Sequence, residues 1–454
     1  MRRYSKPELI RARTAHAGLP QRRSATVGGR ATAHPSEQAE AGGVKRIVRW
    51  TFYAFVFSLS FETVNLGIPV EPTSIIGGLL VMITLAQPRV FFQRPPVAFL
   101  FFILYLCVCA TMILLLGDPH KDEVIRYLFV FSQLIVLCWI SYSLMRHSEL
   151  AKTALITLAA SCVILAILQL TGIATRTPEF VTKLQRATAF GFHPNNVARI
   201  YALGLIVLVG FFYGLYRNVL RPRFLVWPSS ALIGIAIVQT GSRGGLLALG
   251  GGLLVFALTG KNIGIRIRNV VVVLAGLGFF IFLTFQVETT KLRFEKAIEQ
   301  GELARREKIY PTAWQMFLEK PLLGWGPITS SYELGARLRH PREASKNSHN
   351  FVLEILVVTG LAGAALMFTG TGMAVLAAWK ARRNVHAILP FALLVTVLAA
   401  NMSGLWHFNK LHWIVIAYAL ASAGHRAVGS AQRKVTRPIF ASPQLHPSAV
   451  GSSR

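Results

Sequence analysis

Two arginines stand out because each combines a permanent positive charge with small or polar neighbours. Arg243 lies between two apolar runs in the stretch SRGG at 242–245, where the glycines allow close backbone approach by a ligand. Arg199 closely follows the stretch HPNN at 193–196 and starts another apolar run. Guanidinium groups bind phosphate oxygens in a bidentate manner and stay charged at any working pH. The pattern predicts a phosphate or diphosphate site; the alternative is that each arginine snorkels to lipid headgroups.

His349 is the third candidate, in the stretch NSHNF at 347–351 that opens an apolar run. An imidazole titrates near neutral pH and can accept or donate a proton, so a helix start beside a cavity suits a general base. A capping histidine without a chemical role is the alternative. Glu354 lies four residues after Asn350, on the same face of the expected helix, and could orient polar neighbours.

The composition indicates that these residues are positioned by a membrane-embedded framework. Of 454 residues, 53% are hydrophobic and only 15% are charged, and the mean hydropathy is +0.49. The 48 Lys+Arg against 19 Asp+Glu give a formal charge of +29. Long apolar runs separate the basic clusters, whereas a nucleic-acid-binding protein gathers them on one exposed face. We therefore predict an all-α, polytopic transmembrane helix bundle and expect no nucleic-acid partner.

A membrane helix needs about 20 mostly apolar residues to cross the hydrocarbon. By this criterion the sequence predicts about twelve spans. They lie at 47–66, 73–88, 97–116, 124–145, 152–173, 197–216, 224–240, 244–260, 269–287, 350–379, 385–404 and 410–426. The division around 240–245 is open, because one long bent helix would also explain it.

The basic residues of the short loops set the expected orientation, since such loops stay cytoplasmic. The basic N-terminal tail is placed inside, and alternation of the spans then puts five basic loops and the C-terminal tail inside as well. The opposite side receives 65–71, which has no basic residue, and 117–123, which has one. We therefore expect both termini to be cytoplasmic.

This orientation leaves two substantial segments outside, at 174–196 and, much larger, at 288–349. The other parts of the chain divide around the second of them. We expect a disordered basic cytoplasmic tail at 1–46, transmembrane helices 1–9 at 47–287, transmembrane helices 10–12 at 350–426 and a disordered cytoplasmic tail at 427–454. A loop as long as 288–349 is uncommon without function. Residues 291–319 are compatible with a helix, so we expect a partly helical extracytoplasmic cap with the chemistry beneath it.

Four motifs in order resemble the bacterial O-antigen ligase and polymerase superfamily. The run from His349 to Gly363 has a histidine, an amide residue, nine positions and then Gly-x-x-Gly. The HPNN and SRGG stretches come before it, and Arg306 is followed fifteen residues later by PLLGWG at 321–326. The resemblance covers roughly residues 50–425 and leaves out both tails.

The resemblance implies a glycosyltransferase of the bacterial inner membrane, with its active site at the periplasmic face and 288–349 as a periplasmic loop. Such enzymes take a glycan from undecaprenyl diphosphate and pass it to lipid A–core, to another glycan or to a protein hydroxyl. It implies catalytic roles for His349, Arg243 and Arg306 and substrate binding by Arg199 and, more loosely, Arg186. Two amide residues near the motif histidines, Asn195 and Asn350, are also expected to bind substrate. No metal or nucleotide cofactor is implied, because the lipid diphosphate is itself an activated leaving group.

Three interpretations stay open at this stage. Within the favoured one, the histidine–glycine motif favours a ligase in lipopolysaccharide biosynthesis, but an O-antigen or exopolysaccharide polymerase can share it. A transporter or flippase of lipid-linked sugars would also place arginines against a diphosphate, although it predicts internal repeats that the sequence does not show. A membrane scaffold without catalysis would leave the positions of His349 and Arg243 unexplained.

Overall fold

The structure is a computed structural model. It describes residues 44–62, 71–88, 94–116, 120–172, 190, 192–212, 223–259, 262–286, 306–339, 345–383 and 387–424. Arg186, the C-terminal tail and all but residues 44–46 of the N-terminal tail lie outside these described residues. So does the part of the predicted large loop at 288–305.

Every regular element in the described part of the chain is a helix, as the composition predicts. The helices before the cap are α2 (Arg46–Ser58), the short η1 (Leu59–Phe61), α3 (Pro72–Leu85), α5 (Ala98–Leu116), α6 (Lys121–Met145), α7 (Ser148–Leu170), α8 (Pro194–Phe212), the short η2 (Arg223–Leu225), α9 (Val226–Thr240), α10 (Arg243–Ala257) and α11 (Ile263–Phe285). The helices that follow are α13 (Arg306–Glu319), α14 (Thr329–Arg337), α15 (Phe351–Ala381), α16 (Leu389–Asn401) and α17 (Lys410–Ser422).

Each of the twelve predicted spans overlaps one of these helices. Five of them, α6, α7, α8, α11 and α15, are long and apolar enough to cross a membrane by length and composition. Five further apolar helices, α3, α9, α10, α16 and α17, are shorter, as is the Ala98–Leu114 part of α5. The chain is therefore a bundle of membrane-type helices, while the number of crossings and the side on which each terminus lies stay predictions.

The chain between α9 and α10 makes two helices rather than one bent helix. Gly241 ends α9 in the left-handed conformation, with φ 55°, which glycine adopts without steric cost. Ser242 then caps α10, because its side chain accepts a hydrogen bond from Gly245 N at 3.1 Å. This break sets Arg243 at the first position of α10.

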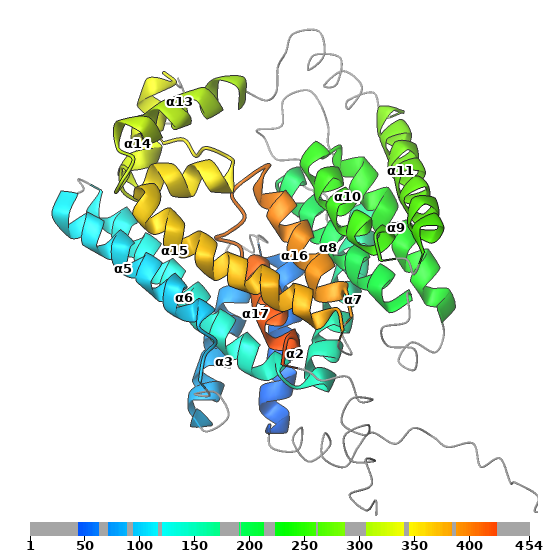
Figure 1. The fold of residues 1–454 in the computed structure, drawn as a ribbon. Coiled ribbons are helices and arrows are strands. Elements are labelled where there is room, and N and C mark those ends of the chain that lie inside the picture. The colour runs from blue at the N-terminus through cyan, green and yellow to red at the C-terminus, as the bar shows by residue number, and fades with distance from the viewer. Residues whose placement is uncertain are drawn as a thin grey trace, which may run out of the picture.

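The core of the bundle lies around α17, all of whose residues are buried and which packs on α6, α15 and α16. Figure 1 shows α17 in the middle of the bundle and α11 at its edge. Glycines bring several helix pairs close together, as is common in membranes. A Cβ at Gly245 would collide with Ala198, so α10 lies directly against α8, and one at Gly370 would meet Phe102, so α15 lies against α5.

The described residues 306–339, which we call the cap, form a separate small layer at one end of the bundle, with α13 and α14 near the start of α15 (Figure 1). The cap has its own apolar cluster, in which Ile309, Met316 and Phe317 of α13 and Leu334 of α14 pack against Val357 of α15. The sequence-predicted helix within 291–319 is thus present over Arg306–Glu319.

The predicted span at 350–379 is interrupted at Gly360, whose φ of 58° and ψ of −159° are not helical. The loop after α13 fills the break, and the freed backbone groups of α15 bond to it instead of to each other. The bonds run from Trp325 N to Val357 O (2.8 Å), from Gly326 N to Val358 O (2.9 Å), from Leu361 N to Pro321 O (2.8 Å) and from Ala362 N to Leu322 O (3.1 Å). The PLLGWG motif therefore clasps the cap to α15, and we call this contact the clasp.

Candidate active site

Arg199 is a buried arginine in the second turn of α8, with only 3% of its surface exposed. Its guanidinium donates from Nη1 to Asn196 Oδ1 at 3.2 Å and from Nη2 to Ser403 Oγ at 3.1 Å. Its Nε has no partner among the described residues. A Cβ at Gly404 would collide with the guanidinium, so the turn between α16 and α17 closes directly over it. Among the described residues no carboxylate accepts a hydrogen bond from this guanidinium, and an unpaired buried charge is costly unless an anion compensates it.

Arg306 reaches the same turn from the cap. It is the first residue of α13, and its Nη2 donates to the carbonyl oxygen of Ser403 at 2.6 Å. Ser403 thus holds two arginines from distant parts of the chain, Arg199 through its hydroxyl and Arg306 through its backbone. The charge of Arg306 repels that of Arg199, so the two guanidinium groups share one electrostatic environment.

Arg243 completes the group from a third helix. Its neighbour Gly244 packs so tightly that a Cβ there would collide with Ser403 Oγ and lie 3.8 Å from Arg199 Nη2. Arg243 itself is partly exposed, and Arg306 repels it as well. The structure therefore brings Arg199, Arg243 and Arg306 together around Ser403, as a basic site at the cap end of the bundle.

His349 lies where the chain leaves the cap and enters α15. Its backbone has φ 54°, which is unusual for a residue with a Cβ and costs about 1–3 kcal/mol. The imidazole is partly buried. This burial, together with the positive charges of Lys346 and Arg306, lowers the pKa of His349 from 6.5 to about 4. His349 is therefore neutral near pH 7, electrostatically coupled to the basic site and able to accept a proton.

Local hydrogen bonds hold the strained turn at His349. Asn350 caps α15, since its Oδ1 accepts from Val352 N at 2.9 Å and Leu353 N at 3.2 Å. On the other side, Glu354 Oε2 accepts from Ser348 N at 3.0 Å and from Ser348 Oγ at 2.7 Å. Glu354 thus orients a polar neighbour, Ser348, as expected. Asn350 caps α15, and its predicted binding of substrate is a separate role.

Two further residues were predicted to bind substrate, Asn195 and Arg186. Asn195 is in the first turn of α8, where its backbone N donates to His193 Nδ1 at 3.3 Å. Arg186 lies outside the described residues. Binding of substrate by Asn195, Asn350 and Arg186 stays a prediction.

Helix starts contribute to the same environment. Arg243 and Arg306 are the first residues of α10 and α13, Arg199 is in the second turn of α8, and His349 comes just before α15. A helix N-terminus carries a partial positive charge and unpaired N–H groups, so it attracts anions. The site is therefore suited to a group with two or more negative charges, such as a diphosphate.

Ser403 and its turn are the part of the basic site that the sequence did not indicate. The turn lies in the short loop between two apolar runs and carries no charge over Asn401–Phe408. The available signal was Gly404 beside a serine at the end of the predicted span 385–404, which is on the same predicted side as the large loop. That signal is weak, because the role of Ser403 depends on arginines about 100 and 200 residues away in sequence.

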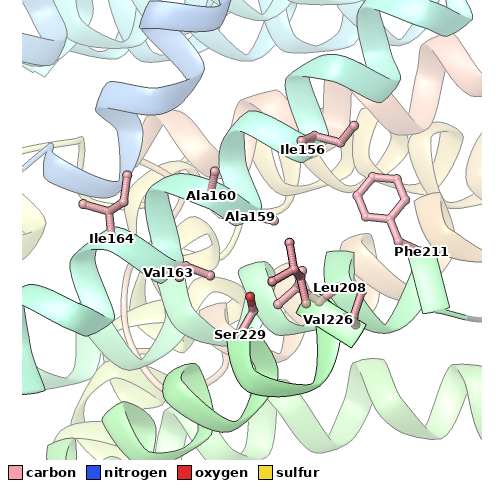
Figure 2. A pocket seen from close by; sticks show the side chains of 10 residues that line it. Ile156, Ala159, Ala160, Val163, Ile164, Leu208, Phe211, Val226 and Ser229 are labelled. Atoms are coloured by element: carbon pink, nitrogen blue, oxygen red, sulfur yellow. The ribbon is translucent and has the colours of Figure 1, made fainter. Parts of the chain in front are cut away.

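A separate cavity of about 290 Å³ lies between α7, α8 and α9. Figure 2 shows apolar side chains on its wall, among them Ile156, Val163 and Phe211, with Ser229 as the polar exception. None of the predicted site residues lines it. The residues that line it carry no ionisable side chain, so it is not the predicted site for acid–base or anion chemistry.

The fold and the site define a class of protein, a helical membrane protein with clustered arginines and a neutral histidine at one end of its bundle. Residues 228–368 match the family model described as O-Antigen ligase. An O-antigen ligase of Pseudomonas aeruginosa is 27% identical over 245 residues, which are 52% of this chain and 56% of that protein. These matches confirm the resemblance to the O-antigen ligase superfamily that the motifs indicated.

The family match covers most, but not all, of the basic site. The family match at 228–368 includes Arg243, Arg306 and His349 together with the clasp, while Arg199 precedes it. The chain spans little more than half the length of the curated relative. The matches and the apolar helices together support a membrane-embedded protein that is similar to O-antigen ligases.

Proposed function

We propose that the protein is an O-antigen ligase-like enzyme that transfers a glycan from undecaprenyl diphosphate to an acceptor hydroxyl at the periplasmic face of the inner membrane. The observation that carries this proposal is the convergence of Arg199 and Arg306 on Ser403, with Gly244, the neighbour of Arg243, packed against the same serine. Three guanidinium groups from three helices are sufficient to neutralise the charge of a diphosphate, and His349 is a neutral base electrostatically coupled to them.

The proposed reaction forms a bond between the acceptor oxygen and the anomeric carbon and breaks the bond from that carbon to the diphosphate. Negative charge grows on the departing oxygens. Arginines that are already fixed in place stabilise this charge most in the transition state, because no reorganisation is needed. His349 accepts the proton of the acceptor hydroxyl. Its low pKa keeps the imidazole unprotonated among the cations before the anionic donor binds.

The first prediction tests the geometry of the basic site. Arg306→Lys keeps the charge but loses the planar fork that bonds both Ser403 O and a diphosphate oxygen, so transfer should fall roughly tenfold, equivalent to about 1.4 kcal/mol of barrier. The measurement uses purified protein in liposomes with an undecaprenyl-diphosphate glycan. Arg337→Lys is the matched control, because Arg337 pairs with Glu319 and Glu333 within the cap. Equal rates for Arg306→Lys and wild type would contradict the proposed role.

The same assay separates the two kinds of transfer. Lipid A–core and free glycan repeats are supplied as separate acceptors. Product on lipid A–core alone identifies a ligase, and elongation of the glycan alone identifies a polymerase. Movement of the donor across the bilayer without any new glycosidic bond would instead favour a flippase and overturn the proposal.

The second prediction concerns pH. Because protonated His349 cannot accept a proton, transfer should fall as the pH falls through the pKa of this residue. In the free enzyme that pKa is about 4, so kcat/KM should hold its neutral value until well below pH 6. A bound diphosphate offsets the cations and raises the pKa of His349, so the acid limb of kcat should lie at higher pH than that of kcat/KM. An acid limb of kcat/KM centred at 6.5, the ordinary value, would contradict this reading.

A further inference from the structure

The break at Gly360 divides α15 into an outer piece and the part that crosses the membrane. Residues 361–381 are 21 residues, which at 1.5 Å each extend about 31 Å and match the hydrocarbon thickness. Residues 351–359 then lie beyond the hydrocarbon, beneath the cap. Gly360 and the clasp are therefore at the level of the bilayer surface on the cap side.

One face of the crossing part is exposed along its whole length. Leu361 is 51% exposed, Leu376 59% and Trp379 44%, with exposed Ala365 and Thr369 between them. These positions recur at helical spacing and form a stripe that acyl chains cover. Leu361 is its outermost member.

The cap continues this stripe outward. Leu361 N donates to Pro321 O and Ala362 N to Leu322 O, so the loop after α13 lies against the end of the stripe. Leu322 is 68% exposed and Leu323 is 52% exposed. Exposure of two large apolar side chains to water is unfavourable, so their exposure indicates an apolar contact.

Helix α13 extends the same surface. Ile309, Ala313, Met316 and Phe317 face the cap core and α15, yet Trp314 and Leu318 are 46% and 57% exposed. These two are four residues apart and lie on one face of the helix. The apolar arc of α13 is thus wider than the surface that α15 covers.

We propose that Trp314, Leu318, Leu322, Leu323 and Leu361, together called the apolar edge, insert into the cap-side leaflet at the boundary of headgroups and acyl chains. The occupant of this surface is bilayer lipid, because the edge is continuous with the lipid-facing stripe of α15. Trp314 and the leucines suit this depth, and tryptophan prefers it. Lys320, exposed beside the ring of Trp325, carries a positive charge at the level of the lipid phosphates.

The insertion fixes the height of the cap above the membrane. Arg306 starts α13, so its guanidinium is held at a constant distance from the bilayer surface. If the proposed function holds, this is the depth at which a lipid-linked diphosphate presents its phosphates. The anchoring itself does not depend on the proposed function and can be tested without any glycan.

The experiment places a nitroxide label at Leu322→Cys in the full chain, with Cys107→Ser as background because Cys107 is the exposed one of the four cysteines. The protein is reconstituted in phosphatidylethanolamine/phosphatidylglycerol liposomes. Collision of the label with oxygen, which concentrates among acyl chains, is compared with collision with a water-soluble nickel chelate. Leu376→Cys, on the lipid-facing stripe, and Ala336→Cys, exposed on α14, are the lipid and water references.

The proposal expects the oxygen-to-nickel collision ratio at residue 322 to exceed that at 336 several-fold and to stay below that at 376, which lies deeper in the hydrocarbon. A ratio like that at 336 would overturn it. Protection of residue 322 from both reagents would also overturn it, since that indicates a protein surface, such as a second copy, on the edge. In a second variant, Leu323→Asp beside the labelled residue 322 should lower the ratio, and an unchanged ratio would count against insertion.

Discussion

Replacing His349 by asparagine or by glycine is expected to abolish glycan transfer and leave the folded protein intact. The backbone at His349 has φ 54°. Asparagine and glycine tolerate this conformation better than other residues, so neither substitution adds strain. Both remove the imidazole, and the loss of a general base should lower kcat by about 10²–10⁴-fold. His349→Gly relieves about 1–2 kcal/mol of left-handed strain and loses about 0.5–1 kcal/mol to chain entropy, so Tm should change little.

The two substitutions, His349→Asn and His349→Gly, separate the loss of the imidazole from a change in backbone conformation. Transfer is measured in single turnovers with saturating donor, and Tm is measured in the same detergent. His147→Asn is a matched control, because His147 is the residue before α7 and is predicted to lie on the opposite side of the membrane. It should retain the wild-type rate. A wild-type rate for His349→Asn would show that the imidazole takes no part in the reaction.

Gly360→Ala is expected to detach the cap from α15 and cost about 3–5 kcal/mol of folding free energy, at the high end for a single substitution. The glycine has φ 58° and ψ −159°, a region that is almost closed to residues with a Cβ. An added Cβ would also collide with the backbone of Leu322 and Leu323. Backbone cannot move aside as a side chain can, so the four hydrogen bonds of the clasp would be lost together.

Gly372→Ala is the matched control in the same helix. A Cβ at Gly372 meets nothing within 4 Å, and alanine favours a helix by about 1 kcal/mol over glycine, so this variant should be as stable as wild type or more so. Thermal unfolding and limited proteolysis of the cap report the two effects. Equal stability of Gly360→Ala and Gly372→Ala would mean that the clasp does not hold the cap.

Glycan transfer should also decrease in Gly360→Ala, because the cap is detached. Arg306 reaches Ser403 from α13, and α13 is fixed to α15 by the clasp and by the apolar cluster around Phe317. When the clasp opens, Arg306 loses its fixed position relative to His349. A displacement of about 1 Å can cost on the order of 10²-fold in rate, so activity is a second readout of the same contact.

The helices were predictable because the membrane imposes a strict rule on sequence. A segment in lipid must bond all of its backbone groups internally, so apolar runs of sufficient length become helices. Each predicted span overlaps a described helix for this reason. The interruption of the span at 350–379 was not predicted, because the backbone groups at Gly360 are satisfied by a loop whose role in the break no local pattern indicates.

The site residues were predictable to the extent that their chemistry shows in one residue. Arg243 beside two glycines and His349 before an apolar run carry their own signal, and the resemblance added Arg306. Ser403 carries no such signal, since a serine in a short loop can have many roles. Its role comes from the two arginines that converge on it, which is a property of packing.

The sequence by itself determined that this chain forms membrane-type helices, that its basic residues mostly lie in loops and tails, and that a few arginines and one histidine remain to be explained by chemistry. These properties follow from hydropathy and charge, which act locally. Only the tertiary structure decided that Arg199 and Arg306 share Ser403, that His349 is neutral and strained beside them, and that a loop clasps the break in α15. These depend on contacts between residues distant in the chain, whose energies arise only when the helices pack.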